Sequence, residues 1–453
     1  MSVSRSNPTP TSTSTRRDVL RTGAAIGIGA AATAALGGAA LAGPAASPAT
    51  HAVQAQDSVE LTWAINATSG TEIDLVQAVV DAFVKANPNY KISVLNYDPE
   101  TYDQKLLTDI SAGTLPDIFV SADVFTKPFF DSGLTADLKP LAAETGFDLN
   151  EFDEKFLALA EYEDKVGFLP RAADVVVTYY NKRMFDDAGL DYPKEDWTYD
   201  DMMAAAEKLT IKASDGTITQ YGVSAGYDWW AYWVPMVVAE GGKILNDEGT
   251  EAVFNSPEGI KAWTYIFDGL KNGWFCPPSV QDTLGGGLPV FTTGKAAMTF
   301  SVRAITPTVR SQLKDDWDVQ LVPKGSASRK TGMGTMGYAI SSQTKDPSAT
   351  WKVMDYTYTD GMKFFMESYL VVPAIKSFYE DPAWRDLPGP PYNNAIFISA
   401  MDDAMLPPPL PFYSTGAFTK AMKDGIDGVL LGQMTPEQAV NNMAQQATAS
   451  LSE

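Results

Sequence analysis

With 453 residues, 45% of them hydrophobic, the chain can bury a large core and is longer than one core usually supports. Its formal net charge of −22 disfavours nucleic acid and anionic lipid headgroups as partners. Cys276 is the only cysteine and His51 the only histidine, which excludes an intramolecular disulfide, a zinc site built from such residues and, after residue 55, a Ser-His-Asp triad. We expect the Cys276 thiol to be buried as a small apolar group.

The first 55 residues have the features of an export signal. Arg16 and Arg17 stand before residues 23–43, a run of mainly Gly and Ala that is too weakly hydrophobic for a convincing membrane span. A twin arginine ahead of such a run is typical of a Tat signal, and the small residues that follow suit signal peptidase. We therefore predict a leader over residues 1–55, cleaved near Ala55, and export to the periplasm or the cell surface. An uncleaved anchor or a disordered basic tail is the alternative.

Strands and helices alternate after the leader. Hydrophobic patterning first predicts strands 59–65, 91–97 and 117–121, with helices beginning at Thr71 and Tyr102. Later helices are expected at 199–209, 257–272, 347–359 and 436–451, and loops at 386–391 and 406–411. This order predicts an α/β fold with parallel sheets, helices on both faces and ligands at the carboxyl ends of strands.

Four segments carry family motifs. They are Ala112–Phe119, with Pro116-Asp117 before a strand; Leu169–Lys182, ending in Tyr-Asn-Lys; Phe291–Met298, with Gly294; and Gly337–Ser341. In this order and spacing they resemble the extracellular solute-binding proteins of family 1, and the likeness covers nearly all of the mature chain.

The resemblance implies a two-lobed periplasmic-binding-protein-like fold of type II, in which each lobe has a mainly parallel sheet flanked by helices and a hinge joins the lobes. We expect the hinge to be crossed near 172–177, 317–323 and 381–391. Lobe one then comprises 56–173 with 323–385, and lobe two comprises 174–322 with 386–453. The resemblance further implies a binding protein for an ABC importer that is not an enzyme and needs no cofactor or metal.

An aromatic cluster, Tyr227–Trp233, is the densest candidate for stacking on a sugar. The adjacent side chains of Trp229 and Trp230 cannot share one helical face, so at least one should leave the core and contact ligand. The alternative is that both serve packing alone. We expect Trp233 to belong to the core.

The hinge and the end of the third strand supply polar candidates. Through the resemblance, Asp174 is expected to accept hydrogen bonds from ligand hydroxyls, with a salt bridge to Arg171 as the alternative. Ser121 and Asp123 follow a buried strand and are expected to face ligand, although Asp123 can instead cap the next helix. Related proteins carry a Trp at Ser121 and another at Ala304, so maltose itself is disfavoured.

Further candidates lie at other strand ends or loops. Trp63 and Asn66 end the first strand, Ser301 and Arg303 follow a later one, Gly334 can offer backbone donors or serve only a turn, and Tyr413 precedes the last helices.

The preferred function is therefore capture of a carbohydrate, of two or more sugar units, by a monomer that delivers it to membrane permease subunits. The alternatives are a secreted glycoside hydrolase or a binding protein for a polyol, a glycerophosphodiester or ferric ion, the last suggested by Tyr179-Tyr180.

Overall fold

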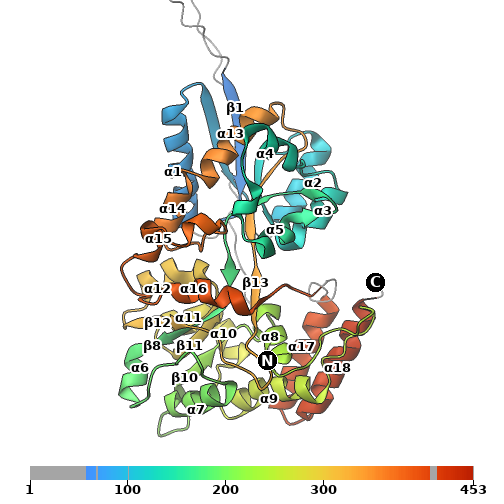
Figure 1. Cartoon of the computed structure of the whole chain (residues 1–453). Coiled ribbons are helices and arrows are strands. Elements are labelled where there is room, and N and C mark those ends of the chain that lie inside the picture. The colour runs from blue at the N-terminus through green and yellow to red at the C-terminus, as the bar shows by residue number, and fades with distance from the viewer. Residues whose placement is uncertain (1–57, 68–69, 100, 409–415, 452–453) are drawn as a thin grey trace, which may run out of the picture. The chain divides into compact units, whose positions relative to one another are not determined.

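The computed structural model describes residues 58–67, 70–99, 101–408 and 416–451 (Figure 1). The predicted leader and Tyr413 lie outside this part of the chain. The described residues form two five-stranded sheets, each accompanied by helices, which confirms the predicted α/β class.

The first sheet holds the N-terminal strands in the order β2-β1-β3-β14-β6. β1 (Val59–Ile65) pairs in parallel with β2 (Tyr90–Asn96) and β3 (Ile118–Ala122). β14 (Met336–Ile340) returns from far along the chain and pairs antiparallel with β3 and with β6 (Leu169–Pro170). The carboxyl ends of β1 and β3 therefore meet at one edge of the sheet.

Helices cover this first sheet. α1 (Gly70–Ala86) and α2 (Tyr102–Ala112) connect the parallel strands, and α13 (Pro347–Tyr358) follows β14. The apolar side of α1 is buried through residues such as Val76 and Phe83. Each helix thus contributes one hydrophobic face to the core.

The second sheet has the order β12-β8-β11-β10-β9. β8 (Val177–Asn181) pairs antiparallel with β11 (Ala296–Ser301) and with β12 (Trp317–Gln320). β10 (Ile218–Ser224) pairs in parallel with β11 and antiparallel with β9 (Ile211–Lys212). The expectation of mainly parallel sheets is wrong in this detail. Both sheets are mixed, because segments that arrive from the other sheet, such as β8 and β14, run against their neighbours.

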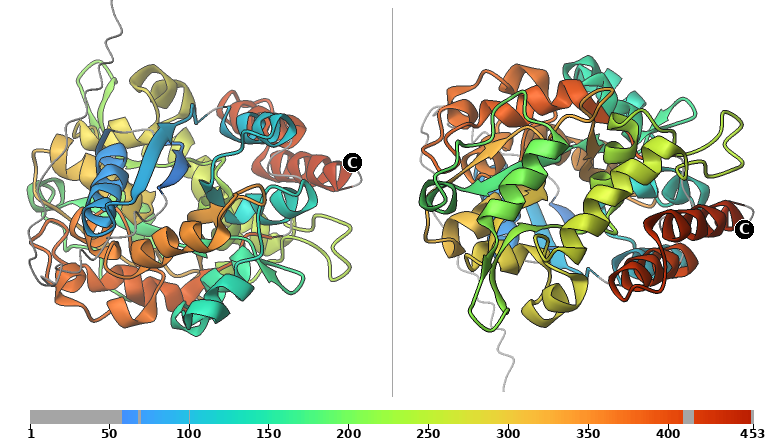
Figure 2. Two further views of the ribbon diagram at one scale, coloured as in Figure 1. Left: turned by 90° about the horizontal axis from the view of Figure 1, so that it is seen from above. Right: turned by 90° about the horizontal axis from the view of Figure 1, so that it is seen from below.

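The helices that accompany the second sheet include α7 (Tyr199–Leu209), α8 (Trp230–Ala239), α9 (Pro257–Lys271), α17 (Gly416–Leu430) and α18 (Pro436–Ser450). α9 contacts α7 and α8 as well as α17 and α18. Figure 2 shows α17 and α18, in dark red, side by side at one edge of this group. The chain therefore ends in a helix pair that packs on the second sheet's helices.

A small third sheet marks where the chain passes between the two large ones. β7 (Asp174–Val175) follows β6 and precedes β8, while β13 (Thr331–Gly334) follows β12 and precedes β14. β13 pairs antiparallel with β7 and in parallel with β15 (Ala404–Met405). The crossing expected at 172–177 lies here. The chain returns to the first sheet between β12, which ends at Gln320, and β14, which begins at Met336, so the crossing expected near 317–323 lies at the start of this passage. The exact lobe boundaries and the third crossing stay predictions.

Most predicted elements have nearly the predicted bounds. β1 and α7 match the expected ranges, and the expected helix 436–451 is α18. The Cys276 thiol is buried, as expected, and burial raises its pKa to about 12. No helix among the described residues is long and apolar enough to cross a membrane.

Candidate ligand-binding site

Two predicted carboxylates meet at the hinge strand β13. Asp174 begins β7 and pairs in register with Gly334. Asp123 begins the short 3-10 helix η1 (Asp123–Phe125), directly after β3, and its N–H donates to the Thr335 carbonyl at 3.1 Å. A Cβ atom at Gly334 would lie 3.0 Å from Asp123 Oδ2. The carboxylate therefore approaches the Gly334 backbone as closely as only glycine allows.

The guanidinium of Arg171 lies in the same region and is almost completely buried. Its Nη1 donates to Glu72 Oε1 at 3.0 Å and to the Tyr338 hydroxyl at 2.8 Å. The guanidinium also lies over the Phe365 ring, 5.1 Å from its centroid. Arg171 is thus committed to Glu72, a residue of α1 that the sequence motifs did not single out, and the alternative salt bridge to Asp174 is not the one formed.

Burial raises the pKa of both hinge carboxylates. The pKa of Asp174 is about 7: burial raises it, Arg171 opposes the rise, and the charges of Asp123 and Glu72 add to it. The pKa of Asp123 is about 6, because burial outweighs hydrogen bonds from the backbone at Val124 and Thr335. Asp174 Oδ1 is shielded from solvent and has no hydrogen-bond partner among the described residues. A buried carboxylate in this state calls for a donor or a positive charge.

A cavity of about 190 Å³ opens at the carboxyl end of β10. The loop Ala225–Asp228 forms one wall, and Gln281 anchors it by donating to the Ala225 carbonyl at 3.1 Å. The polar lining includes Asp228, Gln281, Asp282, Thr419, Lys423 and Asp427. Except for Asp228, which lies in the singled-out aromatic cluster, the sequence analysis missed these residues, because α10 (Pro278–Leu284) and α17 reach the strand end only through the fold.

The tryptophans of the aromatic cluster continue from this cavity wall. Trp229 caps α8 and Trp230 begins it, and both side chains are half-buried. Trp233 is in the core, as predicted, 5.4 Å from the Trp263 ring. A Cβ atom at Gly332 would lie 2.5 Å from Ala231 Cβ, so the first turn of α8 packs directly on β13. In the chain, Trp229 and Trp230 therefore directly precede the residue of α8 that packs on β13.

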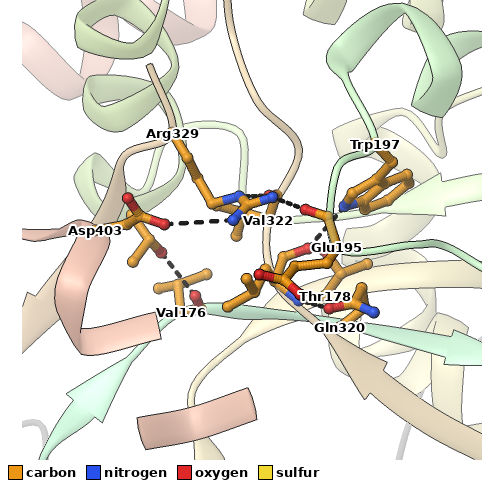
Figure 3. Close-up of polar contacts among 10 residues, drawn as sticks. Val176, Thr178, Glu195, Trp197, Gln320, Val322, Arg329 and Asp403 are labelled. Carbon is orange, nitrogen blue, oxygen red and sulfur yellow. Dashed lines mark hydrogen bonds and ion pairs between the residues drawn. The ribbon is translucent and has the colours of Figure 1, made fainter. Parts of the chain in front are cut away.

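A polar network around Arg329 joins the crossing segments (Figure 3). Arg329 Nε donates to the Val322 carbonyl at 2.9 Å, Nη1 pairs with Asp403 at 3.4 Å, and Nη2 donates to the Glu195 carbonyl. The Thr331 hydroxyl donates to the Val176 carbonyl at 2.6 Å. These bonds tie β13 and the segment before it to β7–β8 and to the end of the 400–403 turn.

Other predicted site residues lie in packing positions. Trp63 is fully buried, with its ring edge-on to Tyr338 at 4.7 Å. Arg303 is fully buried too. It donates to Asn394 Oδ1 at 2.8 Å and faces the ring of Trp384 at 5.1 Å. Burial lowers the pKa of Arg303 to about 10. These two side chains offer no surface to a ligand in this structure.

Three further predicted residues lie near strand ends. Ser121 is buried on β3 opposite Gly337, while Asn66 and Ser301 are half-buried at the ends of β1 and β11. Tyr179 and Tyr180 suggested ferric-ion binding, but the Tyr179 hydroxyl hydrogen-bonds the Val302 carbonyl and the Thr306 hydroxyl. No group of three or more His, Cys, Asp or Glu side chains in the described part of the chain is placed to hold a metal ion.

Two mixed α/β sheets joined through hinge strands, with polar and aromatic groups at strand ends, define a ligand-binding protein of the two-lobed class. The family model of bacterial extracellular solute-binding proteins matches residues 67–363, more than half of the chain. The chain belongs to this family and is the substrate-binding protein of an ABC transporter.

Relatives and solved structures agree with this assignment. A putative binding protein of Brucella abortus is 26% identical, over 83% of this chain and 89% of its own. The sn-glycerol-3-phosphate-binding periplasmic protein UgpB of Escherichia coli is 25% identical, over 88% and 93%. The ABC substrate-binding protein Lmo0181 of Listeria monocytogenes, solved with cycloalternan, has a TM-score of 0.76 and 25% identity, covering 87% of this chain and all of that one. The GacH receptor of Streptomyces glaucescens, at 20% identity, has a TM-score of 0.73, covers 88% and 100%, and supports the fold alone.

Proposed function

We propose that the protein binds a carbohydrate of two or more sugar units between its lobes and delivers it, unchanged, to the permease of an ABC importer. The observation that carries this proposal is the hinge carboxylate of Asp174, whose Oδ1 has no hydrogen-bond partner among the described residues, and the half-buried indoles of Trp229 and Trp230 support it. Flat rings stack on the C–H faces of a sugar, and carboxylates accept from its hydroxyls. Solved relatives in complex with cycloalternan and maltotriose are consistent with this ligand class.

The expected mechanism needs no covalent step. A ligand that contacts both lobes stabilises the closed form by its difference in affinity for the closed and open forms. The network around Arg329 keeps the crossing segments in register while the lobes move. Export through the twin-arginine leader, cleavage near Ala55 and action as a monomer belong to the same proposal.

A glycerophosphodiester is the second candidate, since UgpB is named as an sn-glycerol-3-phosphate-binding protein. The charges around the candidate site oppose it. Arg171 is already bound to Glu72, and Lys423 shares its cavity with Asp228, Asp282 and Asp427. A phosphate would therefore meet mainly carboxylates, which repel it.

Thermal unfolding of the purified protein tests the proposal. A ligand at 100 times its Kd stabilises the folded state by about 2.7 kcal/mol, which raises the Tm by a few degrees. The panel contains mono-, di- and oligosaccharides, a polyol and sn-glycerol 3-phosphate. Stabilisation by a di- or oligosaccharide supports the proposal. Stabilisation only by glycerol phosphate, or by no sugar, contradicts it.

A further inference from the structure

We propose, building on the proposed function, that the ligand is an amine-bearing carbohydrate, whose ammonium group is held by Asp123 and Asp174 in preference to the hydroxyl or amide of a neutral counterpart. The two carboxylates flank Gly334, one from η1 and one from β7, and so converge on one stretch of backbone. This inference concerns the chemical class of the sugar and leaves the carbohydrate site itself as proposed above.

The charges at the hinge do not balance. Two other carboxylates, those of Asp123 and Glu72, and one guanidinium, that of Arg171, act on the charge of Asp174, and this guanidinium is paired with Glu72. Arg171 Nη1 is bound to Glu72 and Tyr338, which leaves Asp123 and Asp174 without a hydrogen-bonded cation of their own. A ligand ammonium would supply the missing positive charge.

Arg303 does not supply this charge. The 3-10 helix η3 (Arg303–Ile305) packs against β7, but Arg303 binds Asn394 and faces aromatic rings. The groups whose charges act on Asp174 are Arg171, Asp123 and Glu72. Of these three charges, two are negative, and only that of Arg171 is positive.

The burial of Asp174 makes the demand specific. Its Oδ1 is shielded from solvent and has no hydrogen-bond partner among the described residues, so a ligand donor would satisfy an acceptor that is otherwise left unpaired. Burial is the main cause of the raised pKa values, about 7 for Asp174 and about 6 for Asp123, and at Asp174 the charges of Asp123 and Glu72 add to the rise. A charge-assisted hydrogen bond from an ammonium is about twice as strong as one from a neutral donor.

The cavity beyond β10 has the same sign. Asp228, Asp282 and Asp427 line it against one cation, Lys423. The half-buried indoles of Trp229 and Trp230, which follow the wall residue Asp228 in the chain, can also stabilise a cation over their faces. Both parts of the candidate site thus favour a positive ligand over a neutral or negative one.

Isothermal titration calorimetry with three matched ligand series tests the inference: glucosamine oligosaccharides with free amines, the same oligosaccharides N-acetylated, and the corresponding glucose oligosaccharides. We expect the amine series to bind at least about tenfold more tightly at pH 7, the factor that 1.4 kcal/mol gives. Equal or tighter binding of a neutral series overturns this inference and leaves the carbohydrate function standing. Failure of all three series to bind overturns both.

Three variants assign the preference to the hinge. Asp174→Asn and Asp123→Asn should each reduce the amine-to-neutral affinity ratio by about tenfold, because they remove a negative charge but keep hydrogen-bonding capacity. Asp164 is an exposed carboxylate in the turn between the short strands β4 (Glu161–Tyr162) and β5 (Lys165–Val166), so Asp164→Asn is the matched control and should leave the ratio unchanged. An equal fall of the ratio in all three variants would mean that only long-range charge matters, and would contradict the assignment.

The pH profile gives an independent readout. Lowering the pH from 7.5 to 5 protonates Asp174 and Asp123, so affinity for the amine series should fall by about tenfold or more. The neutral series should change much less, and Asp174→Asn should flatten the amine profile. A flat amine profile in the unmodified protein contradicts the inference.

Discussion

Two arginines, Arg171 and Arg303, are buried near the crossing segments, but different groups surround their charges. Burial alone would lower the pKa of Arg171, yet Tyr338 and Glu72 raise it above its ordinary value. Among the described residues, Arg303 donates to the neutral Asn394 and faces aromatic rings, and burial, with a smaller effect of the Arg310 charge, lowers its pKa to about 10. Arg171 lies near carboxylates that can bind a ligand, while Arg303 is fully enclosed by residues that pack against it.

The largest effect should come from Arg171→Met. This change leaves Glu72, Asp123 and Asp174 without a cation in a largely buried cluster, so the free energy of unfolding should fall by about 3–5 kcal/mol at pH 7.5. Urea denaturation measures it. The loss should shrink at pH 5, where Asp174 and Asp123 are protonated. A loss that is the same at both pH values would show that Arg171 stabilises by packing and not by charge.

Arg303→Ala should cost somewhat less, about 2–4 kcal/mol, because it opens a cavity beside Trp384 and Phe397. Arg303→Met fills that space without a charge and should recover most of the loss, as replacement of a poorly compensated buried charge often does. The same denaturation experiment compares them. If Met were as destabilising as Ala, the charge of Arg303 would be essential and the contrast with Arg171 would fail.

A smaller effect is expected from pH alone. An aspartate with a raised pKa binds its proton more tightly in the folded than in the unfolded protein, so its contribution is largest at low pH and is lost as pH rises through the folded pKa. For Asp174 and Asp123 this window runs from about pH 4 to about pH 7. After allowance for partial exposure, Asp174→Asn should remove about 2 kcal/mol of this pH dependence. An unchanged slope in the variant would show that Asp174 is not the titrating group.

The order of elements and the hinge acid could be predicted from the sequence, because strand and helix periodicity is local and Asp174 stands at a fixed distance from the Tyr-Asn ending of β8. The partner of Arg171 could not. Glu72 looks like an ordinary first-turn acid of α1, and only the first sheet brings it, from 99 residues away, to within 3.0 Å of the guanidinium.

The surroundings of Trp63 could not be predicted from the sequence either. Trp63 was expected at the ligand edge because it lies near the end of a strand, but strand position does not say which face of the sheet a side chain occupies. In the fold it packs against Tyr338. Lys423 and Asp427, on a helix more than 190 residues after β10, carried no local signal of the cavity they line.

The smallest predicted effect on stability concerns the indoles of Trp229 and Trp230. Trp229→Ala and Trp230→Ala should each weaken binding of the cognate sugar by about 1–3 kcal/mol, because the sugar loses a half-buried ring on which it stacks. Their melting temperatures should change little. Trp233→Ala is the control, because its fully buried ring should cost stability of about 3–5 kcal/mol. Calorimetry and thermal unfolding on the same samples separate the two outcomes, and a Tm loss in Trp229→Ala as large as in Trp233→Ala would place both rings in the core.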